Sequence, residues 1–354
     1  MLTPGRAPLS PPPSRRPVVG LVAYELSVPS FRLRMSALKP ALERGGLDTR
    51  VLAIGSGREW FRVLKLAGAW RSCDLLVFQQ VKLLAGERAF VGRRCGRWVL
   101  DVDDAIMFAY PRRSGEPPSE AMWRQRRFRR MAARCQLVVA GSESLAATIG
   151  AAGHVVVLPT PVDLASYPPA PLPARERVRL AWVGLGGNLC YLEELAPVLR
   201  SLRADGMEFE LHVISDRLPN MPGVPCRLVP WSVSGEGRAL ADCDVGLAPL
   251  PDDSWTRGKS GYRCIQYAAA GLPAVASPVG ANREVICDGI SGLLASTPEQ
   301  WRAALRRLCA DVELRRRMGA AARARARAYD LSEFSRCYLD HLCRLLGLSQ
   351  PAAR

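Results

Sequence analysis

The sequence predicts an α/β fold of two Rossmann-like domains, each a doubly wound parallel sheet, facing each other across a cleft. Three observations support this prediction. Short apolar runs typical of buried parallel strands alternate with helical segments, a proline-rich stretch interrupts the alternation, and the alternation then starts again. At roughly 150 residues per domain, the 354 residues are enough for two cores.

The N-terminal half begins with a proline-rich tail over residues 1–16, which we expect to be disordered. The expected strands follow at 17–23, 49–54, 74–79, 97–102, 136–141 and 154–159. An amphipathic stretch over 33–44, closed by Gly45-Gly46, is the first expected helix. We assign residues 17–160 to the N-terminal domain.

Six prolines within residues 159–177 mark a break, and we assign 161–177 to a linker. Strands are then expected at 178–184, 209–215, 227–231, 244–250 and 273–277, with a helix over 191–203. The pattern is helical from 298 to about 348. We assign 178–330 to the C-terminal domain, 331–348 to a helix that packs back toward the N-terminal domain, and 349–354 to a tail.

Composition excludes several classes of protein. A chain that is 48% hydrophobic and 23% charged is not wholly disordered. No apolar run reaches the roughly 18 residues of a membrane span, and the N-terminus lacks the apolar segment of a signal peptide. The eleven cysteines form no CxxC pair and the three histidines lie far apart, so we expect a cytoplasmic protein without a metal site.

The net charge of +16 favours anionic partners, although a compositional bias toward arginine explains it equally well. The stretch MWRQRRFRRMAAR (122–134) places six arginines around Trp123 and Phe128. Such a helix binds nucleic acid or an anionic membrane surface, or is a solvated face with its aromatics packed inward. We expect no nucleic-acid partner and keep the membrane surface as an expected one.

Two segments are candidates for binding a phosphorylated ligand. WVGLGGN (182–188) is a strand followed by a glycine-rich turn, whose Gly184, Gly186 and Asn188 either approach a ligand or form a tight structural turn. In the second segment, 249–280, a strand is followed by a polar loop and an apolar helix. Lys259 stands just ahead of this helix, where it meets a diphosphate or remains a solvated loop lysine.

Carboxylates follow the strand in LDVDDAI (100–106). Asp101, Asp103 and Asp104 are placed to bind a metal, accept a proton, hold a sugar hydroxyl, or only cap the next segment.

Further polar residues follow other strands. Ser30, Arg32 and Arg34 lie at the first strand-to-helix turn and meet a phosphate across the cleft, unless Arg34 only faces solvent. Glu284 contacts a ligand or caps a turn.

Taken together, these segments resemble the retaining GT-B glycosyltransferases of the large "group 1" type. The matching pieces in the C-terminal half are RLAWVGLGGN, DVGLAPLPDD and RGKSGYRCIQYAAAGLPAVASPVGANREVICDGISGLL. In the N-terminal half, PSFRLRMSALKPALERGG, RWVLDVDDAI and VVAGSESLAATI have counterparts in one branch. The resemblance covers roughly residues 18–345, and its combination of motifs is specific although each piece alone is not.

The resemblance implies that the donor diphosphate lies against the C-terminal domain and that the acceptor enters from the N-terminal domain. Lys259 would neutralise the diphosphate, and Ser30 and Arg32 would lie on the phosphate or acceptor side. The donor-binding residues it implies are Gly184, Gly186, Asn188, Arg257, Lys259, Ser260, Tyr262, Arg263, Gln266 and Glu284.

The sequence departs from the family at one pattern. Many relatives carry Glu-x7-Glu before Ala-x-x-x-Gly-x-Pro, and here Gly258 and Gln266 occupy those two positions. Gln266 can still hydrogen-bond a ribose hydroxyl, whereas Gly258 cannot replace a carboxylate. An acceptor base would come from the N-terminal domain, where Asp103 and Asp104 are the candidates, unless the leaving phosphate itself takes the proton.

The expected function is transfer of a sugar from a UDP-, GDP- or similar nucleotide sugar to a glycan or lipid-linked acceptor hydroxyl. We expect a retaining, metal-independent reaction without a cofactor, in the cytoplasm or on the inner face of the cytoplasmic membrane. The alternative is a catalytically inactive GT-B scaffold that binds a nucleotide or glycan.

Overall fold

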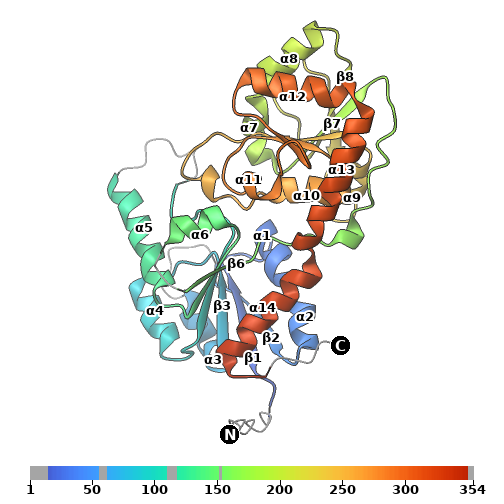
Figure 1. Cartoon of the computed structure of the whole chain (residues 1–354). Helices are drawn as coiled ribbons and strands as arrows, with labels where there is room; N and C mark the ends of the chain where they lie inside the picture. Colours follow the sequence, from blue (N-terminus) through green and yellow to red (C-terminus); the bar gives the residue numbers. More distant parts are fainter. Residues whose placement is uncertain (1–14, 56–61, 110–117, 151–153, 350–354) are drawn as a thin grey trace, which may run out of the picture.

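The computed structural model describes residues 15–55, 62–109, 118–150 and 154–349, so nearly all of both expected tails lies outside the described part. It contains two six-stranded sheets, and every strand pair in them is parallel. Figure 1 shows the sheets in two lobes, one above the other, with helices around each. The predicted α/β fold of two Rossmann-like domains is confirmed.

The N-terminal sheet has the order β2-β1-β3-β4-β5-β6. Its strands are β1 (Val18–Ala23), β2 (Asp48–Ala53), β3 (Leu75–Gln79), β4 (Trp98–Val102), β5 (Leu137–Ala140) and β6 (Val155–Val157). The helices around it are α1 (Pro29–Phe31), α2 (Lys39–Arg44), α3 (Ala67–Arg71), α4 (Ala85–Gly92), α5 (Pro118–Ala132) and α6 (Glu143–Ile149). Strands β3, β4 and β5 are buried along their whole length, because helices cover both faces of the sheet.

The C-terminal sheet has the order β12-β11-β10-β7-β8-β9. Its strands are β7 (Val178–Val183), β8 (Phe209–Ser215), β9 (Cys226–Pro230), β10 (Val245–Ala248), β11 (Ala274–Ala276) and β12 (Gly292–Leu294). Its helices are α7 (Leu189–Glu193), α8 (Ala196–Ala204), α9 (Glu236–Ala241), α10 (Tyr262–Ala270), α11 (Asn282–Val285), α12 (Pro298–Ala310) and α13 (Val312–Ala326). The order is that of a dinucleotide-binding Rossmann sheet.

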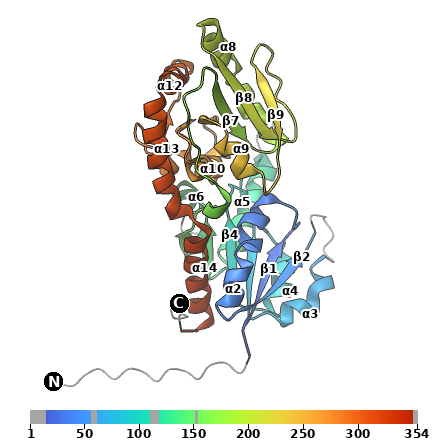
Figure 2. The same cartoon turned by 90° about the vertical axis from the view of Figure 1, so that its right-hand side faces the viewer.

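The last helix, α14 (Leu331–Leu346), leaves the C-terminal domain and packs on the N-terminal one. Figure 2 shows it continuing from the end of α13 to lie beside α2. Its apolar face, Phe334, Tyr338 and Leu342, is buried in the same core as Val19 and Leu21 of β1. The N-terminal core therefore includes residues from both ends of the chain.

Three elements differ from expectation. The helix expected over 33–44 is split into a π-helical turn (Arg32–Ser36), which continues from α1, and α2. The helix expected over 191–203 is two helices, because Pro197 lacks the N–H that a continuous helix needs and instead stands in the first turn of α8. Strand β12 was not expected, since its three residues give no apolar run long enough to recognise.

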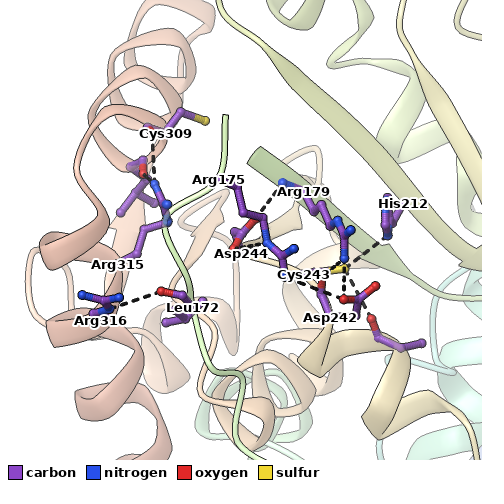
Figure 3. Close-up of polar contacts among 12 residues, drawn as sticks. Leu172, Arg175, Arg179, His212, Asp242, Cys243, Asp244, Cys309, Arg315 and Arg316 are labelled. Carbon is purple, nitrogen blue, oxygen red and sulfur yellow. Dashed lines mark hydrogen bonds and ion pairs between the residues drawn. The ribbon is translucent and has the colours of Figure 1, made fainter. Parts of the chain in front are cut away.

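The segment expected to be a linker is held against the C-terminal domain. In Figure 3, Arg175 lies against Asp244, with its Nε 3.4 Å from a carboxylate oxygen, and Arg316 of α13 donates to the Leu172 carbonyl at 3.2 Å. Tyr167 is buried within the same domain. Specific contacts thus hold this proline-rich segment in place on the C-terminal domain.

Within the described residues, no helix is both long and apolar enough to cross a membrane.

Candidate active site

The order of the strands locates the ligand-binding crevices. In an open parallel sheet, ligands bind beyond the carboxyl ends of the strands where the order reverses. In the C-terminal sheet this point lies between β7 and β10, whose following loops carry Gly184 and Lys259. In the N-terminal sheet it lies between β1 and β3, whose following loops carry Tyr24 and Gln80.

A cleft of about 290 Å³ lies between the two domains and is lined by residues of both. Ten of the predicted site residues line it: Ser30, Asp103, Asp104, Gly184, Asn188, Lys259, Ser260, Tyr262, Arg263 and Gln266. Their gathering from segments more than two hundred residues apart defines the candidate active site.

Two cations on the C-terminal side face this cleft. The Lys259 ammonium lies 5.7 Å from the ring centre of Trp255 and 5.9 Å from that of Tyr191. Arg263 lies over the Trp182 ring at 4.5 Å and donates from Nε to the Val183 carbonyl at 2.7 Å. No carboxylate among the described residues lies within 4 Å of either cation. Burial lowers the pKa of Arg263, so a bound anion would offset an unfavourable buried charge.

The N-terminus of α10 opens onto the same place. Its N-cap, Gly261, has φ of 63°, and no side chain caps the helix. A Cβ at Gly261 would lie 2.9 Å from the Cβ of Ala281, so glycine suits both the backbone angle and the close approach. The free N–H groups of the first turn, together with Lys259 and Arg263, favour a phosphate group here.

Asp103 and Asp104 follow β4 on the N-terminal side. Asp103 is 5% exposed and accepts hydrogen bonds from the side-chain amides of Gln79, at 3.2 Å, and Gln80. Burial and then the nearby Asp104 raise the pKa of Asp103 to about 7. Burial also raises the pKa of Asp104, against the opposing effect of Lys259. A carboxyl group that titrates near neutral pH is suited to exchange a proton with a substrate hydroxyl.

Gln80 was missed by sequence reasoning, and its backbone marks it as unusual. It has φ of 55°, a left-handed conformation that a non-glycine residue adopts only at a cost. The conformation carries its side chain to Asp103. A pair of polar residues directly after the apolar run DLLVF is the signal that would have indicated it.

Asp101 and Arg34 do not belong to the cleft. Both are fully buried, and Arg34 pairs with Asp101 through two hydrogen bonds of 2.7 and 2.9 Å. Tyr338 of α14 donates to the same carboxylate at 3.2 Å. Both expectations for Arg34, phosphate binding and exposure to solvent, are therefore wrong. Arg34 also donates to the Leu158 carbonyl and to Thr160, which lines the cleft.

Four other predicted residues lie outside the lining of the cleft. Arg257 is exposed and pairs with Asp252 at 2.6 Å, and Arg32 lies over the exposed ring of Trp231 at 5.4 Å. The Gly186 N–H donates to the Asp216 carboxylate at 2.6 Å, so this N–H group already has a hydrogen-bond acceptor within the protein.

The fourth, Glu284, joins the domains. Its carboxylate accepts the backbone N–H groups of Glu143 and Ser144 at 3.0 and 2.9 Å, and the Ser144 hydroxyl at 2.8 Å. It thus caps the first turn of α6 from the other domain. Of the two roles expected for Glu284, ligand contact and capping of a turn, the structure shows capping. The capped turn belongs to the other domain.

Gln266 is buried and donates to the Tyr167 hydroxyl at 3.4 Å. Tyr167 in turn donates to Glu236, which also accepts the Trp231 indole N–H. Gln266 is thereby held at the edge of the cleft by a chain of polar contacts to the loop after β9.

Comparison with known proteins is consistent with this geometry. The model of the family Glycosyl transferases group 1 matches residues 192–311. The D-inositol 3-phosphate glycosyltransferase of Frankia alni is 29% identical over 245 residues, which span 57% of this chain and 58% of the relative. The enzyme of the same name from Nocardioides is 38% identical over 82 residues, 23% of this chain and 18% of the relative.

Solved structures extend the likeness to nearly the whole chain. Sucrose-phosphate synthase from Thermosynechococcus elongatus superposes with a TM-score of 0.71 at 15% identity, covering 94% of this chain and 99% of that one. Anabaena HepE in complex with UDP and glucose gives 0.68 at 14% identity, covering 93% and 100%. The fold is therefore GT-B. The family model supports the resemblance to the group 1 glycosyltransferases over residues 192–311, in the C-terminal domain, and the solved structures support the GT-B fold of both domains.

Proposed function

We propose that this chain is a retaining glycosyltransferase that moves a sugar from a nucleoside-diphosphate donor to an acceptor hydroxyl. The observation that carries the proposal is the anion site formed by Lys259, Arg263 and the N-terminus of α10, inside a cleft lined by both domains. HepE, which shares the fold, was solved with UDP and with UDP-glucose. That likeness supports a nucleotide sugar as donor.

In the proposed reaction, the bond from the sugar C1 to the diphosphate oxygen breaks and a bond from C1 to the acceptor oxygen forms. The diphosphate leaves with the bonding electrons, and Lys259 and Arg263 stabilise its negative charge. The acceptor proton passes to the leaving phosphate oxygen or to the carboxylate of Asp103 or Asp104. These two acids suit the second route because they lie on the opposite wall of the cleft.

We further propose that the reaction needs neither metal nor cofactor. The two cations and the helix terminus already supply positive charge where the diphosphate would lie. Within the described ranges, no three His, Cys, Asp or Glu side chains are grouped to hold a metal ion. Turnover that persists in EDTA would support this point, and its abolition by EDTA would contradict it.

Donor hydrolysis and transfer with purified protein test the main proposal. We expect hydrolysis of one nucleoside-diphosphate sugar, and we expect Lys259→Ala to reduce it at least 100-fold while the melting temperature stays unchanged. Lys39→Ala is the matched control, since this partly exposed lysine pairs with Glu43 on α2, outside the lining of the cleft. Tight nucleotide binding with no turnover of any donor would favour the scaffold alternative, for which the absence of a carboxylate at Gly258 is the motivation.

We also propose peripheral attachment to the inner face of the cytoplasmic membrane, which would suit a lipid-linked acceptor. Helix α5 exposes Met122 and Trp123, each about half accessible, next to the exposed Arg126 and Arg129. Exposed apolar side chains beside arginines favour an anionic bilayer surface. Cosedimentation with vesicles should require phosphatidylglycerol and weaken in Trp123→Ala. Equal recovery with neutral phosphatidylcholine vesicles would contradict the attachment.

A further inference from the structure

Groups from three neighbouring strand ends hold Asp103 in place. Asp103 follows β4, and its carboxylate oxygen Oδ1 accepts hydrogen bonds from two side-chain amides. One amide belongs to Gln79, the last residue of β3, at 3.2 Å, and the other to Gln80, the next residue. On the other side lies Gly141, directly after β5. A Cβ at Gly141 would lie 2.9 Å from the Cα of Asp103, so this close approach requires glycine.

The two amides leave one oxygen of Asp103 for a ligand. Among the described residues, no hydrogen bond is made to Oδ2 of this carboxylate. Since Asp103 lines the cleft, Oδ2 is the atom that the hydroxyl of a bound acceptor can reach. Asp104 lines the cleft as well, but no side chain of the described part of the chain donates a hydrogen bond to its carboxylate. The fold therefore positions Asp103 much more firmly than its neighbour.

Gln80 reaches Asp103 at a cost in backbone conformation. Its φ of 55° is left-handed, although its N–H still donates to the Asp101 carbonyl at 2.8 Å. Glycine would adopt this conformation without strain and would keep the same backbone hydrogen bond. Only the amide side chain would be lost. A strained residue persists where the surrounding structure or the function requires it, and here the amide is what glutamine adds.

The charges around Asp103 decide the pH at which it can take up a proton. Burial raises its pKa the most, to about 7, and the nearby Asp104 raises it further. Arg34 opposes this rise, Asp101 adds to it, and the hydrogen bond from Gln80 lowers the pKa. A donor to a carboxylate favours the ionised form, which is the form that can accept a proton. Gln80 thus keeps part of Asp103 ionised at neutral pH.

We propose that Asp103, and not Asp104, takes the proton of the acceptor hydroxyl, and that Gln80 is the positioning residue that holds Asp103 for this step. The inference rests on the proposed function and selects one of the routes left open there. The acceptor O–H bond breaks, its proton passes to Oδ2 of Asp103, and its electron pair forms the new bond to the sugar C1. The diphosphate leaves with the electrons of the old bond. Asp103 returns the proton to water after the product has left.

The pH dependence of donor hydrolysis, with water as the acceptor, tests the choice between the two acids. UDP-glucose, GDP-mannose and ADP-glucose are offered in turn, and kcat/KM for the donor that the parent protein hydrolyses is followed from about pH 5 to 9. We expect the parent rate to rise through about pH 7. Asp103→Asn should remove the rise and lower the rate about 100-fold. Asp104→Asn should keep the rise and move it to lower pH, because a like charge beside Asp103 is lost. Loss of the rise in Asp104→Asn alone would overturn the proposal.

Two substitutions separate the amide of Gln80 from its backbone. Gln80→Leu and Gln80→Gly both remove the amide, and both should move the rise to higher pH by roughly one unit, so that the rate below pH 7 falls about tenfold. Gln80→Gly should be at least as stable as Gln80→Leu, since glycine suits the left-handed backbone. The control Gln136→Leu removes an amide that contacts Gly96 and Trp98, outside the lining of the cleft, and should leave the profile unchanged.

Three results would be decisive against one idea or the other. Parent-like rates in Gln80→Gly would show that the amide has no positioning role. An unchanged pH profile in Gln80→Leu, with the parent protein active, would refute the inference alone. Absence of donor hydrolysis by the parent protein would instead refute the proposed function.

Discussion

Gly258 packs directly against Ala105 across the cleft, so that a Cβ at position 258 would lie 2.3 Å from the Cβ of Ala105. In the family pattern this position carries a glutamate. Here the loop after β10 instead touches the segment that follows Asp103 and Asp104. The arrangement leaves no room for a side chain. The carboxylates that line the same cleft as Lys259, those of Asp103 and Asp104, come from the other domain.

Gly258→Ala should therefore push the two domains apart. Overpacking of a tight contact costs roughly 1–3 kcal/mol, and we expect at least a tenfold loss in kcat/KM for the donor. The double variant Gly258→Ala/Ala105→Gly removes the opposing Cβ and should recover most of the activity. Failure of this rescue would show that the contact does not limit closure of the cleft.

Asp103→Asn should stabilise the protein at high pH. The pKa of Asp103 is raised to about 7 in the folded state, so the folded chain binds more protons than the unfolded chain between about pH 4 and 7. Stability is therefore lost as the pH rises through this window. Urea unfolding should show Asp103→Asn more stable than the parent at pH 8, by roughly 2–4 kcal/mol, with little difference at pH 4. The same difference at both pH values would contradict the buried, protonated state.

Glu284→Gln should loosen α6 without unfolding either domain. The carboxylate holds two free N–H groups of the first turn and bears a negative charge at a helix N-terminus, an effect of roughly 0.5–1 kcal/mol. Hydrogen exchange of the Glu143 and Ser144 amides should become severalfold faster, while exchange in β5 stays unchanged. Glu299→Gln, at the start of α12, provides a control helix in the C-terminal domain. Unchanged exchange at α6 would mean that the interdomain bond contributes little.

Arg34→Met should destabilise the N-terminal domain strongly. It leaves Asp101 buried with Tyr338 as its one remaining side-chain partner among the described residues, and breaking a buried ion pair costs about 3–5 kcal/mol. Replacing both partners, as in Arg34→Met/Asp101→Leu, removes the uncompensated charge and should be less harmful than Arg34→Met alone. Urea unfolding of the three proteins checks the order. Equal stability of the single variant and the parent would contradict the role of the pair.

The sequence was sufficient to predict the sheets and most of the cleft, because both depend on local patterns. Buried parallel strands are continuous apolar runs, and the residues that follow them meet at one edge of the sheet. Lys259, Asp103 and Gly184 could be found in this way. Contacts between distant segments could not be predicted in this way. No residue near Arg34 in the sequence indicates that Asp101 is its partner, and none near Glu284 indicates that its carboxylate caps α6.

Helix α14 has a consequence for how the polypeptide folds as it is made. The N-terminal domain emerges first from the ribosome, yet Phe334, Tyr338 and Leu342 complete its core and Tyr338 reaches the buried Asp101. Until α14 has been translated, the apolar side chains of that domain that pack against it remain uncovered beside α2. The first domain to be synthesised is thus the last to be finished, and during that interval it depends on protection from aggregation.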